Sequence, residues 1–158
     1  MKSKFQGRKL LQHYGGDILT SQGMEQEKRF MQHGSVSVYE HSVAVALMCL
    51  HLAALLHLRT NTRSLVRGAL LHDYFLYDWH VKVKGRPLHG LHHARWAMAN
   101  AERDFGLNHI ERNMILTHMF PLNLALPRYR ESALLCTADK ICAARETWQG
   151  IVHRRKRP

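Results

Sequence analysis

Apolar residues along this chain recur mostly at spacings of three and four, the repeat of an amphipathic helix. The clearest run extends from Ser37 to about residue 58, and Ser37 and Glu40 at its start fit a capping box. Its stripe reads Val38, His41, Val45, Met48, Leu52 and Leu55. The same spacing predicts further helices over about 22–33, 60–73 (ending at the His72-Asp73 doublet), 92–105, 108–118 and 130–147.

The breaks between these segments are typical of short connections in a helical domain. Gly34 and Gly106 suit left-handed caps after two of the helices. Residues 74–91 lack a helical repeat and are expected to be irregular, and no stretch alternates as a half-buried strand does. The chain has 158 residues and no repeat or linker. It therefore predicts one all-α domain, residues 1–158, of about six or seven helices with a core at about 35–147 and basic terminal extensions.

Composition narrows the environment and the partners. The formal net charge of +11 favours anionic partners, although much of it lies in the termini, where charges are usually solvated. Three cysteines, Cys49, Cys136 and Cys142, form no Cys-x-x-Cys pair and lie in apolar segments, so each is expected to be a reduced core residue. No secretory signal and no segment of membrane-spanning length are recognised, which predicts a cytoplasmic protein without a membrane partner and leaves its oligomeric state open.

The adjacent residues His72 and Asp73 are the most informative feature of the sequence. They follow a mostly apolar run, Leu65–Leu71, and burying an imidazole and a carboxylate costs free energy unless a partner satisfies them. Asp139 raises the same problem inside the apolar segment 133–142, because its neighbour Lys140 points elsewhere on a helix. Both features require a strong interior partner.

Four histidines and two aspartates from five segments together indicate an interior metal site. They are His41, His72, Asp73, His93, His118 and Asp139. One histidine in a helical stripe is more often an ordinary core residue, but six such residues in packing segments favour metal ligation. Imidazole and carboxylate suit divalent transition metals, and packed helices can aim them into one pocket. His92 competes with His93 for its position, and His93 is preferred because it immediately precedes the helix stripe.

The order of His41, His72-Asp73 and Asp139 resembles the motif of the HD-domain superfamily of metal-dependent phosphohydrolases, over roughly residues 35–147. That superfamily is all-α. His93 and His118 fall where some members insert two further histidines and hold two metals, as the symmetrical diadenosine tetraphosphatases do. Residues 72–80, His-Asp-Tyr-Phe-Leu-Tyr-Asp-Trp-His, also resemble a stretch of small uncharacterised bacterial HD proteins.

The chain departs from several subgroups of this superfamily. Tyr74-Phe75 follow the doublet in place of the Ile-Gly of one well-known subgroup. The Gly-Tyr-Pro motif of cyclic-di-nucleotide phosphodiesterases and the signature of guanosine tetraphosphate hydrolases have no counterpart here. The resemblance thus implies the superfamily's chemistry without fixing the substrate.

The resemblance implies an enzyme, a phosphomonoesterase or phosphodiesterase, that hydrolyses a phosphate ester with a metal-activated water. Asp73 would bridge two divalent ions per chain. The other ligands would divide between the ions, with His41, His72 and Asp139 on one and His93 and His118 on the other. Iron, manganese, zinc and nickel all tolerate such ligands. No serine or cysteine has a convincing nucleophile context.

Further residues are expected to act on the substrate. Those expected to contact its phosphate are Lys82, Lys84, Arg86, Lys140 and Arg145, the first three in a basic loop that could equally be an exposed polar loop. Asp73, His80 and Lys82 are the expected catalytic residues, with His80 as general acid to the leaving group. Four aromatic residues, Tyr74, Tyr77, Trp79 and Trp96, offer stacking on a base, although core packing is their commoner role.

Three functions remain open from the sequence. The leading one is a phosphohydrolase acting on a nucleotide or a related small phosphate ester, and a narrower one is a dinucleoside polyphosphate hydrolase. The third is a basic nucleic-acid-binding or regulatory protein whose HD site senses a ligand, which the basic termini suggest. The complete ligand set favours the enzymes, because a pure binding protein has little use for six metal ligands.

Overall fold

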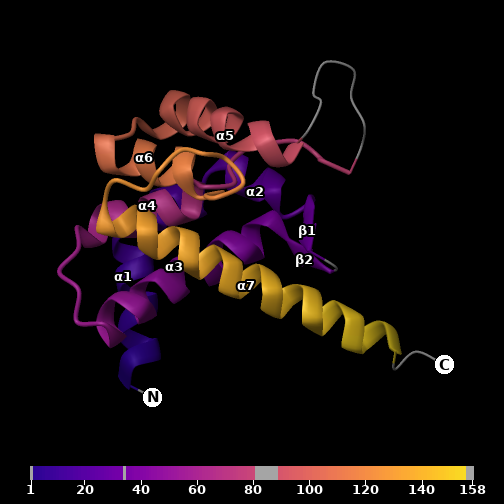
Figure 1. Cartoon of the computed structure of the whole chain (residues 1–158), viewed down its shortest axis with the longest axis horizontal. Helices are drawn as coiled ribbons and strands as arrows, with labels where there is room; N and C mark the ends of the chain where they lie inside the picture. Colours follow the sequence, from indigo (N-terminus) through magenta and orange to yellow (C-terminus); the bar gives the residue numbers. More distant parts are fainter. Residues whose placement is uncertain (1, 34, 81–88, 156–158) are drawn as a thin grey trace.

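The computed structural model describes residues 2–33, 35–80 and 89–155 of the chain. Its elements follow in the order α1 (Lys2–Leu19), α2 (Gln22–Glu27), β1 (Met31–His33), β2 (Val36–Ser37), α3 (Val38–Leu55), α4 (Thr62–Leu71), α5 (His89–Phe105), α6 (His109–Thr117) and α7 (Arg130–Arg155). The all-α class is confirmed (Figure 1). The short antiparallel hairpin β1–β2 corrects the expectation that the chain forms no strand.

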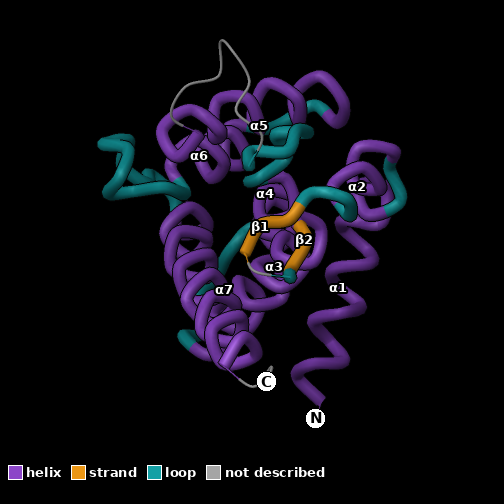
Figure 2. Tube along the Cα trace, turned by 90° about the vertical axis from the view of Figure 1, so that its right-hand side faces the viewer, coloured by secondary structure: helices purple, strands orange, loops and turns teal. Residues whose placement is uncertain are grey.

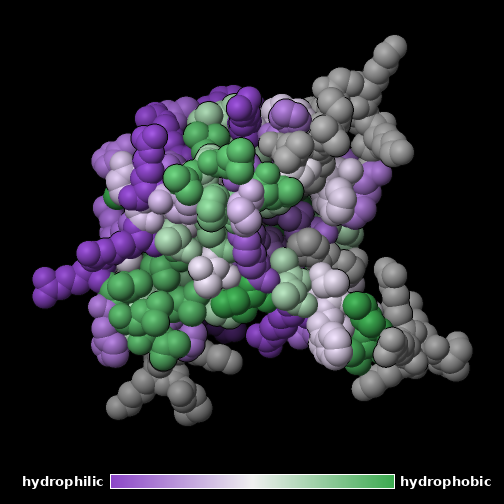
Figure 3. Space-filling model, viewed as in Figure 1, coloured by the Kyte–Doolittle hydropathy of each residue, from purple (hydrophilic) through white to green (hydrophobic). Residues whose placement is uncertain are grey.

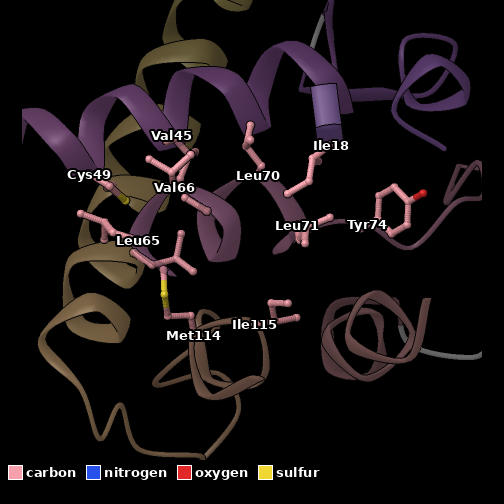
Figure 4. Packing of buried hydrophobic residues seen from close by; sticks show 14 of the residues in the cluster. Ile18, Val45, Cys49, Leu65, Val66, Leu70, Leu71, Tyr74, Met114 and Ile115 are labelled. Carbon is pink, nitrogen blue, oxygen red and sulfur yellow. The ribbon is translucent and has the colours of Figure 1, made fainter. Parts of the chain in front are cut away.

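Helix α4 forms the centre of the molecule, packed against α1, α3 and α6. All its residues from Ser64 to Leu71 are buried (Figure 4). Two glycines allow this enclosure: a Cβ at Gly15 of α1 would lie 2.4 Å from Leu70 Cδ1, and one at Gly68 would lie 2.6 Å from Met114 Sδ. The neighbouring helices therefore approach α4 more closely than side chains would permit. The three cysteines are buried and form no disulfide, as expected.

Several helix ends lie where the sequence predicted them. Ser37 and Glu40 form the capping box of α3, and Asn108 and Glu111 form that of α6. Asn61 caps α4 through a bond from the Ser64 backbone N–H to its side-chain oxygen. These caps satisfy first-turn N–H groups that lack helical partners, so each helix begins at a defined residue.

The N-terminal region differs from the prediction. Helix α1 was not expected, and the expected helix over 22–33 ends at Glu27, after which the chain turns into the hairpin that faces the viewer in Figure 2. Tertiary hydrogen bonds explain the change: Trp79 Nε1 donates to the Met31 carbonyl at 3.1 Å, and Gln32 donates to Asp73. The hairpin places the Met31 carbonyl and the Gln32 side chain where these two bonds can form. Gly34, the expected cap, lies outside the described residues.

Helix α3 is the one described helix that is long and apolar enough to cross a membrane, judged by length and composition alone. No segment of membrane-spanning length was expected from the sequence. Here α3 packs chiefly against α4 and α7, and it buries the polar residues His41 and Ser42. Its apolar character thus serves the core of the domain.

A buried arginine ties three helices together. Arg67 of α4 is 3% exposed, and its guanidinium lies 3.2 Å from Glu111 of α6 and 3.1 Å from Asp17 of α1. It also donates to the carbonyls of Phe105 and Gly106 at the end of α5. A buried charge is tolerated when its donors are paired in this way.

Candidate metal centre

The His72-Asp73 doublet lies where α4 ends in the middle of the molecule. His72 is the C-terminal cap residue of α4, and both side chains are almost fully buried. His72 Nδ1 donates to the Ala69 carbonyl at 2.7 Å, which fixes the ring and directs Nε2 inward. That buried Nε2 has no hydrogen-bond partner.

His118 repeats the same arrangement at the end of α6. It is the C-terminal cap residue of that helix, it is buried, and its Nδ1 donates to the Ile115 carbonyl at 2.7 Å. Two helices thus end with a histidine whose Nδ1 is bound to the carbonyl three residues earlier. Their Nε2 atoms are presented to one interior space.

Helices α3 and α7 supply the opposite side of this space. His41 Nε2 lies 3.1 Å from Asp139 Oδ1, although 98 residues separate them in the chain. His41 Nδ1 donates to Glu146 Oε2 at 2.8 Å. His41 is therefore held between two carboxylates of α7, which lie two helical turns apart on the face that packs against α3.

Asp73 occupies the centre and its two oxygens face different histidines. Oδ1 lies 3.3 Å from His93 Nε2 and 3.5 Å from His118 Nε2. Oδ2 lies 3.4 Å from His72 Nε2 and 4.0 Å from His41 Nε2. The site thus divides into two groups that share Asp73, one with His41 and His72 and the other with His93 and His118, each with ligand atoms within 4.8 Å of one another.

All six predicted ligands converge in this structure. Asp139 joins the first group, with Oδ1 3.7 Å from His72 Nε2, and His93 Nε2 lies 2.9 Å from His118 Nε2. His92 is half-buried beside Trp96, with ring centroids 6.1 Å apart, so His93 occupies the position for which the two competed.

Charge within the cluster favours a cation. Burial alone would raise the pKa of Asp73, but the neighbouring histidines, His72 first, outweigh it and hold that pKa well below the ordinary value. The pKa of Asp139 is likewise lowered by His41 and His72 against the effect of burial. Both carboxylates are therefore ionised in the buried site, which raises its affinity for positive charge.

The histidines respond in two ways. Burial opposes the charged form of His41, yet its hydrogen bonds to Asp139 and Glu146 raise its pKa to about 10. Burial lowers the pKa of His118, and Asp73 does not offset it. Neutral His118 then offers its Nε2 lone pair, the form that binds metals.

This donor set fits a divalent metal. It provides imidazole nitrogens and carboxylate oxygens, which iron, manganese, zinc and nickel accept. A buried imidazole nitrogen without a hydrogen-bond partner, as at His72 Nε2, costs free energy that a metal bond would remove. Asp73 Oδ1 likewise makes no well-aligned hydrogen bond, although two imidazole nitrogens lie within 3.5 Å. The cluster can hold a metal ion.

A pocket of about 630 Å³ opens onto the cluster. Asp73, His93, His118 and Asp139 form its polar floor, and Lys140 contributes a cation on the wall. The remaining lining side chains are mostly apolar: Trp79, Met119, Pro121, Leu122 and Ala143. Lys140 Nζ donates to the carbonyls of His118 and Cys136 at 3.3 and 3.2 Å, which holds the ammonium beside the floor.

The other predicted substrate residues are distributed differently. Arg145 lines a separate groove of about 620 Å³ between α1 and α3, together with Arg8 and His51. His80 is half-exposed and bonded to Asp78 at 3.2 Å, beside the pocket residue Trp79 but outside the lining itself. The basic residues Lys82, Lys84 and Arg86 lie outside the described residues.

The aromatic residues also separate. Trp79 lines the pocket, whereas Tyr74 is buried and donates its hydroxyl to Asp104 at 3.1 Å. Tyr77 and Trp96 stack edge to face, 5.5 Å apart, against the core. Of the four, Trp79 therefore has the position to contact a ligand.

Two functional residues escaped the sequence analysis. Glu146 binds His41 from seven residues beyond Asp139, so it lies on the same face of α7, and this spacing is a signal that could have found it. Gln32 donates to Asp73 from the unexpected hairpin, and no local pattern marks it. Both contact candidate ligands, in the position that outer residues of metal sites commonly take.

No family model, no curated protein and no solved structure matches this chain. The helical structure with its buried cluster of histidines and aspartates is compatible with an HD-like fold. The likeness to that superfamily rests on the order of the ligands in the sequence and on their convergence in space.

Proposed function

We propose that the chain is a metal-dependent phosphohydrolase of the HD type, acting on a phosphate ester of a nucleotide or a related small molecule. One observation supports it most: ligands from α3, the ends of α4 and α6, α5 and α7 converge on Asp73. A purely structural role needs no such set, because a buried salt bridge can be replaced by apolar residues of similar volume at little cost.

The two groups around Asp73 favour two ions per chain. His41, His72 and Asp139 would hold one ion and His93 and His118 the other, with Asp73 donating one oxygen to each. Bound divalent ions lower the pKa of water towards neutrality and neutralise phosphoryl oxygens.

The protein's own residues would position the ester and exclude water. Lys140, the cation among the described residues lining the pocket, is placed to contact a phosphoryl oxygen. Trp79 and Leu122 offer an apolar wall to the remainder of the substrate. Catalysis would then depend on positioning and charge stabilisation, without a covalent intermediate.

His80 is the proposed general acid, with Lys82 as a further phosphate contact. His80 follows the pocket residue Trp79, and its ring stacks on the indole with centroids 4.0 Å apart. His80→Ala should reduce turnover strongly for alkyl phosphates and little for a nitrophenyl phosphate, whose leaving group needs no proton. Equal losses for both substrates would remove His80 from this role.

The direct test combines metal analysis with a substrate screen. The protein is reconstituted with iron, manganese, zinc or nickel and assayed against nucleoside mono- and polyphosphates, dinucleoside polyphosphates, cyclic nucleotides and a chromogenic ester. Asp73→Asn should lose hydrolysis in every combination while its helical spectrum persists. Retained activity in this variant would exclude the proposal.

A matched pair of α6 variants tests the number of ions. His118→Ala should reduce the bound metal from about two ions per chain to about one, since the second group loses a ligand. His109→Ala, at an exposed position of the same helix, should retain both ions. A stoichiometry near one in the unmodified protein would leave a mononuclear site.

A further inference from the structure

One face of the molecule is unusually apolar. It is formed by the loop between α6 and α7 and by the outer side of α7, and we call it the apolar face. Its large exposed residues are Leu122, Leu124, Leu126, Ile141, Trp148 and Ile151. Leu124 is 90% exposed and Trp148 is 68% exposed. In Figure 3, which looks onto this side, hydrophobic residues gather over the loop and alternate with more polar residues along α7. A further hydrophobic patch lies near the C-terminal end of α3, where Leu55 and Leu56 are exposed. Exposed apolar surface of this kind can mark an interaction site.

The outer side of α7 has the pattern of a helix that packs against something. Its exposed apolar and small residues are Ala133, Thr137, Ile141, Ala144, Trp148 and Ile151, spaced by three or four. The opposite side of the helix already packs in the core through Leu135, Ala138 and Cys142. A helix with apolar residues on both sides is expected only where both are covered.

The charges on this face are all of one sign. Across residues 119–152, the exposed charged side chains are Arg128, Arg130, Lys140 and Arg145, of which Arg145 lines the groove between α1 and α3 and the other three belong to the apolar face. The acidic residues of the same stretch turn inward: Glu131 and Glu146 are buried, and Asp139 faces the metal centre. The segment therefore presents apolar groups and cations to solvent, with no exposed carboxylate among these residues.

We propose that the apolar face docks onto the surface of an anionic lipid bilayer. Leucine and tryptophan side chains enter the interface between headgroups and acyl chains, while lysine and arginine contact the anionic headgroups. A second copy of the chain fits poorly, because it would bring like charges together on a protein whose net charge is already +11. Surface docking needs no membrane span, and it is an alternative to the expectation that the protein has no membrane partner.

The metal centre opens within this face. Pro121 and Leu122 of the loop line its pocket on one side, and Lys140 and Ala143 of α7 line it on the other. Docking therefore holds the mouth of the pocket at the lipid surface. The proposed docking does not depend on the proposed hydrolysis, because vesicle binding is measured without a substrate.

Sedimentation of the metal-loaded, full-length chain with lipid vesicles tests the proposal. We expect binding to vesicles in which phosphatidylglycerol replaces part of the phosphatidylcholine, and much weaker binding to pure phosphatidylcholine. Leu124→Asp should weaken binding by about tenfold or more, because it removes an inserted leucine and adds a charge that the surface repels. At 90% exposure, Leu124 contributes little to folding.

Ala99→Asp is the matched control, because it adds the same charge at an exposed position of α5. It should bind as the unmodified chain does; an equal loss would show that net charge alone governs binding and would overturn the apolar docking. Brominated lipids should quench the emission of Trp148, and Trp148→Phe should lose that component. Failure to bind either vesicle also overturns the proposal, as does a dimer in solution that Leu124→Asp dissociates.

Discussion

Glu146 makes the metal centre testable without knowledge of the substrate. Its carboxylate accepts the Nδ1 proton of His41 at 2.8 Å, and both groups are buried, so water screens their interaction little. Removing such a partner from a metal-bound histidine costs about 10–100-fold in metal affinity. That loss equals roughly 1.4–2.8 kcal/mol, at about 1.4 kcal/mol per tenfold.

Two substitutions separate the charge from the hydrogen bond. Glu146→Gln keeps an oxygen that can accept the Nδ1 proton, so its loss of metal affinity should lie near the lower end of that range. Glu146→Ala removes the acceptor and frees the imidazole to rotate, so its loss should be the greater. The order of the two variants follows from the structure, whichever divalent metal binds.

The assay is competition for metal with a chromogenic chelator, with helical content followed by circular dichroism. Thr147→Ala changes an exposed neighbour on the same helix and should bind as the unmodified protein does. If Glu146→Ala bound metal within about twofold of that control, well inside the expected range, Glu146 would have no part in holding His41 as a ligand.

Three further predictions concern stability. Chelation should lower the melting temperature by roughly 5–11 °C, because metal at a hundred times its Kd contributes about 2.7 kcal/mol and a domain of this size shifts about 2–4 °C per kcal/mol; an unchanged melting temperature would contradict a native metal site. Glu27 is fully buried without a hydrogen bond, and burial raises its pKa well above the ordinary value. The folded state thus holds that proton more tightly, so stability falls as pH rises above about 4.5, the ordinary pKa. Glu27→Gln should therefore stabilise the protein more at pH 8 than at pH 5 in urea titrations, and the opposite order would be evidence against this reasoning. Arg67→Met should cost about 3–5 kcal/mol in the same titrations, because it removes the buried cation that contacts Glu111 and leaves only the exposed Arg63, 3.7 Å away; a loss below about 1 kcal/mol would show that the pair contributes only as much as a surface ion pair.

The ligands could be predicted because they contradict the pattern around them. His72, Asp73 and Asp139 are polar residues in segments that otherwise consist of core positions, and such residues need strong partners in the interior. The helix caps could also be predicted from neighbouring residues, because Ser37 or Asn108 with a glutamate three residues later defines the start of a helix by itself. Signals of this kind depend on neighbours in the chain.

The features that were missed depend on packing between distant segments. The inward stripe of α1 reads Leu11, Gly15, Ile18, and a glycine that packs tightly against α4 looks like a helix breaker in the sequence. The hairpin pairs strands of three and two residues, too short for an alternating pattern. Gln32 acquires its role only when that hairpin meets Asp73.

The backbone also contributes to the metal centre. The last carbonyls of a helix lack partners within the helix, and the C-terminal end has a partial negative charge. At the ends of α4 and α6, His72 and His118 each donate Nδ1–H to such a carbonyl and direct Nε2 inward. For His72 and His118, a backbone carbonyl therefore orients the ring. For His41, the carboxylate of a side chain, Glu146, has this role. Two negative helix ends and two ionised aspartates therefore surround one buried space, an arrangement that folding alone would disfavour and a bound cation would stabilise.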